Sequence, residues 1–235
     1  MSSVVESLSC FVRSSIGKKI LVAVTGLVLV VFVLGHMIGN LLAFAGPDAI
    51  NAYGHLLQTS LHGGGVWIAR VGLLAAVVVH VVATISLTRQ SRAARPDAYG
   101  RQKAQVSGRA ARTMIWSGLT LLCFIVFHLL HFTVRNIENF SGPDYEVVLD
   151  GEKMHNVYKM VVVGFSNVGV SAFYILSMVL LYGHLSHGVS SLFQTLGLAT
   201  HRSERIFKGL GHAYALLILV GNCSIPLAVI AGVLK

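Results

Sequence analysis

Apolar residues along the chain gather into five long runs that are separated by polar connections. The runs cover residues 20–45, 66–88, 113–135, 157–184 and 210–234. Each is long enough to cross a hydrocarbon layer of roughly 30 Å, which takes about 20 helical residues. The first run is too long for the apolar part of a signal peptide and contains His36 and Asn40, so we expect it to be retained. The pattern predicts an all-α membrane protein in which residues 1–235 form a single bundle of five transmembrane helices.

The composition agrees with a protein that is surrounded by lipid. Hydrophobic residues make up 54% of the 235 residues, and charged residues make up only 11%. A water-soluble globular protein usually has about twice that share of charge, so a soluble enzyme is not expected and intrinsic disorder is excluded. The three cysteines show no CxxC spacing, and the sequence therefore predicts neither a disulfide framework nor a thiolate metal site.

Basic residues are distributed unevenly between the two ends of the predicted bundle. Thirteen of the eighteen Lys and Arg residues fall in the N-terminal tail and in the loops 89–112 and 202–208. This side is expected to be cytoplasmic, which puts the N-terminus inside and the C-terminus outside. The net charge of +9 follows from this topology, and no nucleic-acid partner is expected because the basic loop 89–112 contains no recognisable binding motif. A soluble partner or anionic lipid headgroups on these loops remain alternatives.

Histidines are frequent, with eleven against nine Asp and Glu residues, and several lie inside the apolar runs. An ionisable side chain at membrane depth is costly and is by default a sign of function. His36 follows Lys19 by 17 residues, which places it about 25 Å from the inner end of its helix. His128 follows Arg112 by 16 residues, or about 24 Å. These two histidines are expected at one depth, in the outer half of the bundle.

A second pair of histidines is expected in the inner half. His80 precedes Arg89 by 9 residues, about 13 Å, on a helix that runs inward, and His184 lies at the inward end of the fourth run. Opposed imidazoles from different helices suit the two faces of an iron porphyrin. Iron that is held on both faces transfers electrons and does not bind oxygen. The two levels predict two haems, although each histidine could instead hydrogen-bond a neighbouring helix.

Several other residues are weaker candidates. His131 and His187 each follow one of these histidines by three residues and share its helix face, so we expect them to contact a haem propionate or a quinone. Gly35, Gly39 and Gly183 stand near the proposed ligands and are expected to let a flat ring approach the backbone. The remaining histidines are expected at the interface or in solvated loops: His212, His55, His62, His155 and His201.

Between residues 14 and 234 the chain resembles the single-chain, five-helix dihaem cytochrome b anchor of bacterial succinate:quinone oxidoreductases and quinol:fumarate reductases. The segments that produce the resemblance are SIGKK at 15–19, TG at 25–26, GHMIGNL at 35–41, GPD at 46–48, NAY at 51–53, WIAR at 67–70, FHLLHF at 127–132, HLSHG at 184–188 and FQTLG at 193–197. The combination is specific to that family, whereas each segment alone would be weak.

The resemblance implies a complex with two partners, a flavoprotein subunit that holds FAD and the dicarboxylate site and an iron–sulfur subunit. It implies two haem b groups, with His36 and His128 as axial ligands of the outer one and His80 and His184 as ligands of the inner one. Quinone, specifically menaquinone, would react near the outer haem. Tentative contacts to quinone or propionate are His131, His187, Arg70 and Asn40. Some members use an acidic residue just before the inner ligand, but Tyr182 and Gly183 stand here and the apolar runs contain no Asp or Glu.

The sequence leaves two alternatives open. The same subunit could work in reverse in a quinol:fumarate reductase. The other alternative belongs to a different functional class, a histidine-lined transporter for metal ions or protons. Transporters tend to have inverted repeats and broken helices with intramembrane acids, and the sequence shows neither.

Overall fold

The computed structural model describes residues 2–94 and 109–235, and residues 1 and 95–108 are outside this description. The helices are α1 (Ser2–Arg13), α2 (Ser15–Leu41), α3 (Pro47–Thr59), α4 (Gly64–Ala93), α5 (Arg109–His128), α6 (Val157–Ser166), α7 (Val168–Thr195) and α8 (Glu204–Ile230). Short helical turns cover η1 (Leu42–Ala45), η2 (Ser60–Gly63), η3 (Leu129–Thr133) and η4 (Pro143–Tyr145). Two strands, β1 (Glu146–Leu149) and β2 (Glu152–His155), complete the fold.

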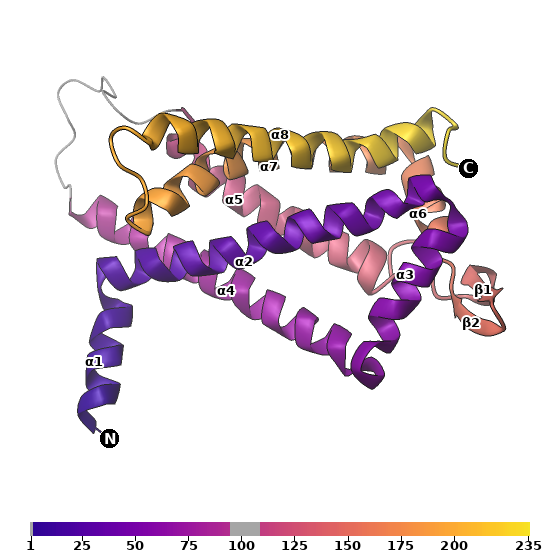
Figure 1. Ribbon diagram of the computed structural model, residues 1–235, viewed down its shortest axis with the longest axis horizontal. Helices are drawn as coiled ribbons and strands as arrows, with labels where there is room; N and C mark the ends of the chain where they lie inside the picture. The colour runs from indigo at the N-terminus through magenta and orange to yellow at the C-terminus, as the bar shows by residue number, and fades with distance from the viewer. Residues whose placement is uncertain (1, 95–108) are drawn as a thin grey trace.

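Within the described residues, five helical segments are long and apolar enough to cross a membrane, as the sequence predicts. Their large apolar side chains are exposed on the outside of the bundle, which is expected where lipid is the solvent. Figure 1 shows the N-terminus and the C-terminus at opposite ends of the long axis, in keeping with an odd number of crossings. The chain is therefore a multi-pass membrane protein.

Four of the long helices form a ring. α2 lies beside α4, α4 beside α5, α5 beside α7, and α7 beside α2. Consequently α2 faces α5 across the centre of the ring, and α4 faces α7. The fifth long helix, α8, packs along α7 and also contacts α2, outside the ring (Figure 1).

The contact between α7 and α8 is close because small residues line it. A Cβ atom on Gly211 would lie only 2.6 Å from the backbone oxygen of Ser186. Farther along α8, the Met37 side chain of α2 fills the space above Gly221. Small residues commonly allow membrane helices to approach this closely, since van der Waals packing replaces the hydrophobic effect in lipid.

The fourth predicted span, 157–184, differs from the observed structure in its middle and at its C-terminal end. The structure divides this region into α6 and α7, which break at Asn167, and α7 continues to Thr195. The Asn167 side chain accepts hydrogen bonds from the backbone N–H groups of Gly169 and Val170, so it caps the new helix. Residues 185–195, which lie beyond the predicted end of this span, are therefore helical as well.

The end of the bundle opposite α1 has its own small structure, which the sequence analysis did not predict. It consists of α3, the antiparallel hairpin β1–β2 and α6 (Figure 1). Pro47 occupies the first turn of α3, where its missing N–H costs nothing. Asn51 joins these pieces, because its side chain accepts a hydrogen bond from the backbone of Tyr158 at 3.0 Å. This small subdomain closes one end of the ring.

At the other end, α1 leaves the bundle at a steep angle to α2 (Figure 1). Ser14 separates the two helices and accepts a hydrogen bond from Gly17, which caps α2. The described part of the predicted loop 89–112 is helical, since α4 ends at Ala93 and α5 begins at Arg109. The basic residues Arg95, Arg101 and Lys103 lie outside the described residues.

Candidate functional site

The two histidines that the sequence places in the outer half approach one another across the ring. The centroids of the His36 and His128 rings are 5.7 Å apart, and the ring planes are nearly perpendicular at 88°. Each ring stacks on a phenylalanine one helical turn earlier, His36 on Phe32 at 5.3 Å and His128 on Phe124 at 5.8 Å. The pair therefore comes from the diagonal helices α2 and α5, and both rings are supported in the same way.

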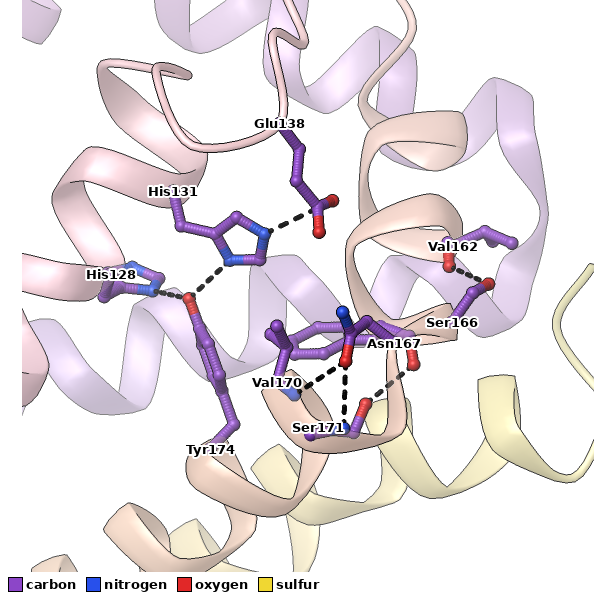
Figure 2. Close-up of polar contacts among 11 residues, drawn as sticks. His128, His131, Glu138, Val162, Ser166, Asn167, Val170, Ser171 and Tyr174 are labelled. Atoms are coloured by element: carbon purple, nitrogen blue, oxygen red, sulfur yellow. Dashed lines mark hydrogen bonds and ion pairs between the residues drawn. The ribbon is translucent and has the colours of Figure 1, made fainter.

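His131, the neighbour of His128 on the same helix face, points elsewhere. Its ring is completely buried, and its Nδ1 atom lies 3.0 Å from the hydroxyl of Tyr174. The same hydroxyl is 3.3 Å from Nδ1 of His128 (Figure 2). On its other side, Nε2 of His131 lies 3.7 Å from a carboxylate oxygen of Glu138. The geometry thus separates His128, which faces His36, from His131, which belongs to a polar network with Tyr174 and Glu138.

The segment after His131 is conformationally unusual. The helix ends in a π turn over Leu129–Thr133, a form that is frequent at functional sites. Arg135 and Asn139 follow with positive φ angles of 63° and 47°, which non-glycine residues rarely adopt. Nε of Arg135, Nε2 of His131 and one oxygen of Glu138 are buried without a hydrogen-bond partner. Burial and the nearby charge of Arg70 lower the pKa of Arg135.

The two inner histidines are each held by a hydroxyl group on the adjacent helix. Nδ1 of His80, on α4, lies 3.1 Å from the hydroxyl of Thr25 on α2. Nδ1 of His184, on α7, lies 3.2 Å from the hydroxyl of Ser117 on α5. The rings come from the diagonal helices α4 and α7 and are near enough to interact electrostatically. The structure therefore brings His36 and His128 into contact and places His80 and His184 on the two helices of the other diagonal.

The hydroxyl groups and the outer histidines belong to one segment that occurs twice. Residues 25–36 read TGLVLVVFVLGH, and residues 117–128 read SGLTLLCFIVFH. The two copies share the hydroxyl residue, the glycine after it, the phenylalanine and the final histidine. Both copies run in the same direction, on α2 and α5 (Figure 1). The pair is short and parallel, so it is not the inverted repeat that is typical of many transporters.

The outer pair fits an iron porphyrin by distance. Two imidazoles that bind one metal ion each have a metal–nitrogen bond of about 2 Å. With the distance from each nitrogen to its ring centroid added, the two centroids should lie about 6 Å apart. The observed 5.7 Å between His36 and His128 is close to this value. A Cβ atom on Gly35 or Gly183, the residues before His36 and His184, would meet no atom within 4 Å, so there is open space beside one ligand of each couple. The residues present are therefore compatible with haem at both levels.

One expectation about the glycines is wrong. Gly39 does not leave room for a flat cofactor, because the ring of Tyr53, on α3, already occupies that space. A Cβ atom on Gly39 would lie 2.4 Å from Cε1 of Tyr53. The glycine serves the packing of α3 on α2 instead.

The weaker candidates are spread over four helices. His187 is half-buried on α7, and Asn40 is half-buried near the end of α2. Arg70 is exposed and lies over the ring of Trp67, with 5.0 Å between the guanidinium carbon and the ring centroid. For His212, which is expected at the interface, Nδ1 lies at a hydrogen-bond distance of 3.1 Å from the hydroxyl of Tyr182.

Sequence reasoning missed four residues of the site, namely Thr25, Ser117, Tyr174 and Glu138. The first two were detectable, because residues 25–36 and 117–128 align without gaps. The other two gave no signal, since a tyrosine in an apolar run and a glutamate in a loop are common. Comparisons with protein-family models, curated proteins and solved structures found no match for this chain.

Proposed function

We propose that this chain is the membrane anchor and dihaem electron-transfer subunit of a bacterial succinate:quinone oxidoreductase. It would lie in the inner membrane and pass electrons from an iron–sulfur subunit to menaquinone. The observation that carries the proposal is the arrangement of four histidines from four helices, in two couples across the diagonals of one ring. No dicarboxylate site is proposed on this chain, because FAD and the iron–sulfur clusters would belong to the partner subunits.

In the proposed site His36 and His128 hold the outer haem, and His80 and His184 hold the inner one. Each bound haem would supply a one-electron centre without an open coordination position. The imidazoles fix the plane and depth of each centre, while the apolar surfaces of α2, α4, α5 and α7 exclude water. Ring stacking on Phe32 and Phe124 limits rotation of the outer ligands. These are the properties that electron transfer across a bilayer requires.

The quinone is proposed to react at the outer end of the bundle. The segment from His131 to Glu138 contains a guanidinium group, an imidazole and a carboxylate. Each of them has a buried polar atom that lacks a hydrogen-bond partner. Such groups suit the two oxygen atoms of a quinone, which accept hydrogen bonds and take up protons on reduction. Arg70 adds a second guanidinium group near Arg135. The same groups would serve the reverse reaction of a quinol:fumarate reductase.

The partner subunits are proposed to bind at the basic end, where α1 and the connection between α7 and α8 lie (Figure 1). Positive charge on cytoplasmic loops is the usual consequence of membrane insertion. Exposed basic residues at this end also suit an acidic protein surface, and they include Arg13, Lys19 and Arg205.

The direct test is optical. The chain, purified from cells supplied with haem and reduced with dithionite, should show the spectrum of a six-coordinate, low-spin b-type haem at about two haems per chain. His36→Ala or His128→Ala should remove one haem, and His80→Ala or His184→Ala the other. His62→Ala, in an exposed turn, is the matched control and should retain both. A colourless wild-type protein would exclude the proposal.

The transporter alternative is decided by the same experiment. The structure contains a broken helix at Asn167 and two short copies that run in the same direction, whereas the transporter pattern is an inverted repeat with broken helices that carry intramembrane acids. The break is internally satisfied, because the Ser171 hydroxyl donates to the Phe165 carbonyl at 2.7 Å (Figure 2). A transporter would bind metal ions or protons without a haem spectrum.

A further inference from the structure

The inner histidines differ from the outer ones in the hydrogen bond that their Nδ1 atom makes. Thr25 contacts Nδ1 of His80 and Ser117 contacts Nδ1 of His184, at 3.1 Å and 3.2 Å. These contacts come from equivalent positions of the two copies, eleven residues before His36 and His128. Within the described residues, His36 has no hydrogen-bond partner for its ring, and His128 shares a tyrosine hydroxyl with His131.

The direction of these hydrogen bonds follows from what else the hydroxyls do. The hydroxyl of Thr25 donates its single proton to the carbonyl of Leu21 at 2.6 Å. The hydroxyl of Ser117 donates to the carbonyl of Met114 at 3.1 Å. A hydroxyl that donates to a carbonyl offers its lone pairs to the imidazole, which favours an Nδ1 atom that carries the hydrogen and donates; for His80 the backbone carbonyl of Val22 is a second acceptor. A neutral imidazole protonated at Nδ1 has its lone pair on Nε2.

The glycine after each hydroxyl residue completes the contact. A Cβ atom on Gly26 would lie 3.4 Å from Cε1 of His80, and one on Gly118 would lie 3.4 Å from Cε1 of His184. These equal distances show that both rings rest against the backbone of the adjacent helix in the same place. We name the pairs Thr25–Gly26 and Ser117–Gly118 the hydroxyl clamps. The clamps hold both the tautomer and the position of the inner rings.

We propose that the two hydroxyl clamps are positioning elements for the inner metal site, which direct Nε2 of His80 and of His184 towards the centre of the ring. The inference rests on the proposed function and extends it to residues that do not themselves bind iron. A hydrogen bond from the non-coordinating nitrogen makes an imidazole a stronger donor to the metal. A stronger donor stabilises the oxidised iron, so the clamps lower the reduction potential of the inner haem. Each copy of the repeat thus provides an outer ligand and an inner clamp on the same helix.

The experiment is a redox titration of the full chain, followed by optical and electron paramagnetic resonance spectra that separate the two haems. Thr25→Val and Ser117→Ala remove the acceptors with little change in volume. Each should raise the midpoint potential of the inner haem, leave the outer haem unchanged, and shift the low-spin resonance of the inner haem. Thr25→Ser and Ser117→Thr keep a hydroxyl and should restore the wild-type values.

Two hydroxyl residues provide matched controls. Thr84, on α4, donates to the backbone carbonyl of His80 rather than to its ring, and Thr120, on α5, donates to the carbonyl of Trp116. Thr84→Val and Thr120→Val should leave both potentials unchanged. Loss of the inner haem alone in Thr25→Val, with rescue in Thr25→Ser, also supports the proposal.

Three results would overturn the clamp proposal. These are unchanged potentials in Thr25→Val and Ser117→Ala, an equal shift or equal loss of both haems, and failure of the conservative variants to restore the inner haem. All three presuppose a coloured wild-type protein. A colourless wild-type protein refutes the proposed function itself, so the two failures are distinguishable.

Discussion

Gly211 is the residue at which α7 and α8 approach most tightly through their backbones, because a side chain there would meet the Ser186 carbonyl at 2.6 Å. Gly209 lies two positions earlier in the same helix, and a Cβ atom there would meet nothing within 4 Å. The two glycines therefore have different roles, although the sequence context is similar.

This difference predicts opposite effects of the same substitution. Gly211→Ala should destabilise the bundle by about 1–3 kcal/mol, the usual cost of inserting a methyl group into close packing. Gly209→Ala should be neutral or stabilising by up to about 1 kcal/mol, since alanine favours the helix. Reversible unfolding of the purified protein in mixed micelles measures both. Equal effects would contradict the packing argument.

At the same scale, individual histidines were predictable but their partners were not. An imidazole in an apolar run is conspicuous, and helical rise places His36 level with His128. The choice between His128 and His131 needed coordinates, because residues three apart share a face and only the ring directions separate them. Tyr174 is part of the site because α7 packs beside α5. The sequence of either helix alone does not predict this contact.

The hairpin β1–β2 is an element whose stability depends on pH through His155. Its ring stacks near Tyr145, with 6.3 Å between the centroids. Burial, followed by the charge of Arg135, lowers the pKa of His155 to about 4. The usual unfolded value is about 6.5. Between these values the unfolded hairpin binds a proton that the folded one does not.

We therefore expect the folded hairpin to be fully stable above about pH 6.5 and to lose stability as the pH falls towards 4. Hydrogen exchange of residues 146–155, measured from pH 5 to pH 7 and corrected for the intrinsic rate, should show more opening at the lower pH. His155→Phe should remove most of this dependence, whereas His201→Phe, in an exposed turn, should not. A pH dependence that persists in His155→Phe would contradict the assignment.

The helix α1 is amphipathic and stands away from the bundle. Phe11 and Val12 are exposed, and Cys10 lies on the opposite, polar face of the helix. Arg13 and Lys18 follow, and basic residues favour anionic lipid headgroups. An isolated helix of 12 residues is marginal in water, so we expect α1 to lie in the plane of the inner membrane interface.

Spin labels on adjacent residues test this expectation. With the other cysteines replaced, a label on Phe11→Cys should be accessible to oxygen dissolved in the bilayer. A label on Cys10 should be accessible to a water-soluble nickel complex. The same two labels are also measured in detergent solution without lipid. If α1 needs no membrane, both labels should keep the accessibilities that they have in vesicles. Equal accessibility of both labels in vesicles would refute the interfacial position.

Elements also show where hydrophobic periodicity is insufficient. The apolar run 157–184 continues through the break at Asn167, because both halves face apolar surroundings and the pattern has no gap. The hairpin and α3 lie in connections whose composition did not distinguish them from loops.

For the molecule as a whole, the distribution of basic residues predicts the orientation. Thirteen of eighteen Lys and Arg residues fall in the N-terminal tail and in the segments 89–112 and 202–208 of the sequence. With the two termini at opposite ends (Figure 1), the N-terminus should be cytoplasmic and the C-terminus periplasmic.

Reporter fusions check this orientation. Alkaline phosphatase fused after Lys235 should be active, because it needs export to fold, whereas green fluorescent protein at the same position should be dark. Fusions after Thr200, in the connection between α7 and α8, should give the reverse pattern. A fluorescent and phosphatase-negative fusion at Lys235 would show that the chain is inserted the other way round.

The sequence by itself determined the all-helical class of this protein and its five membrane-spanning runs, and it predicted the levels of four histidines along their helices. Apolar length, the cost of ionisable groups in lipid and a rise of about 1.5 Å per residue are properties of single helices. Only the tertiary structure decided which helices are neighbours and which are diagonal. That order pairs His36 with His128, sets Thr25 and Ser117 against the inner rings, and turns His131 towards Glu138. The reason is that contacts between helices depend on packing among several segments at once, and no local pattern records it.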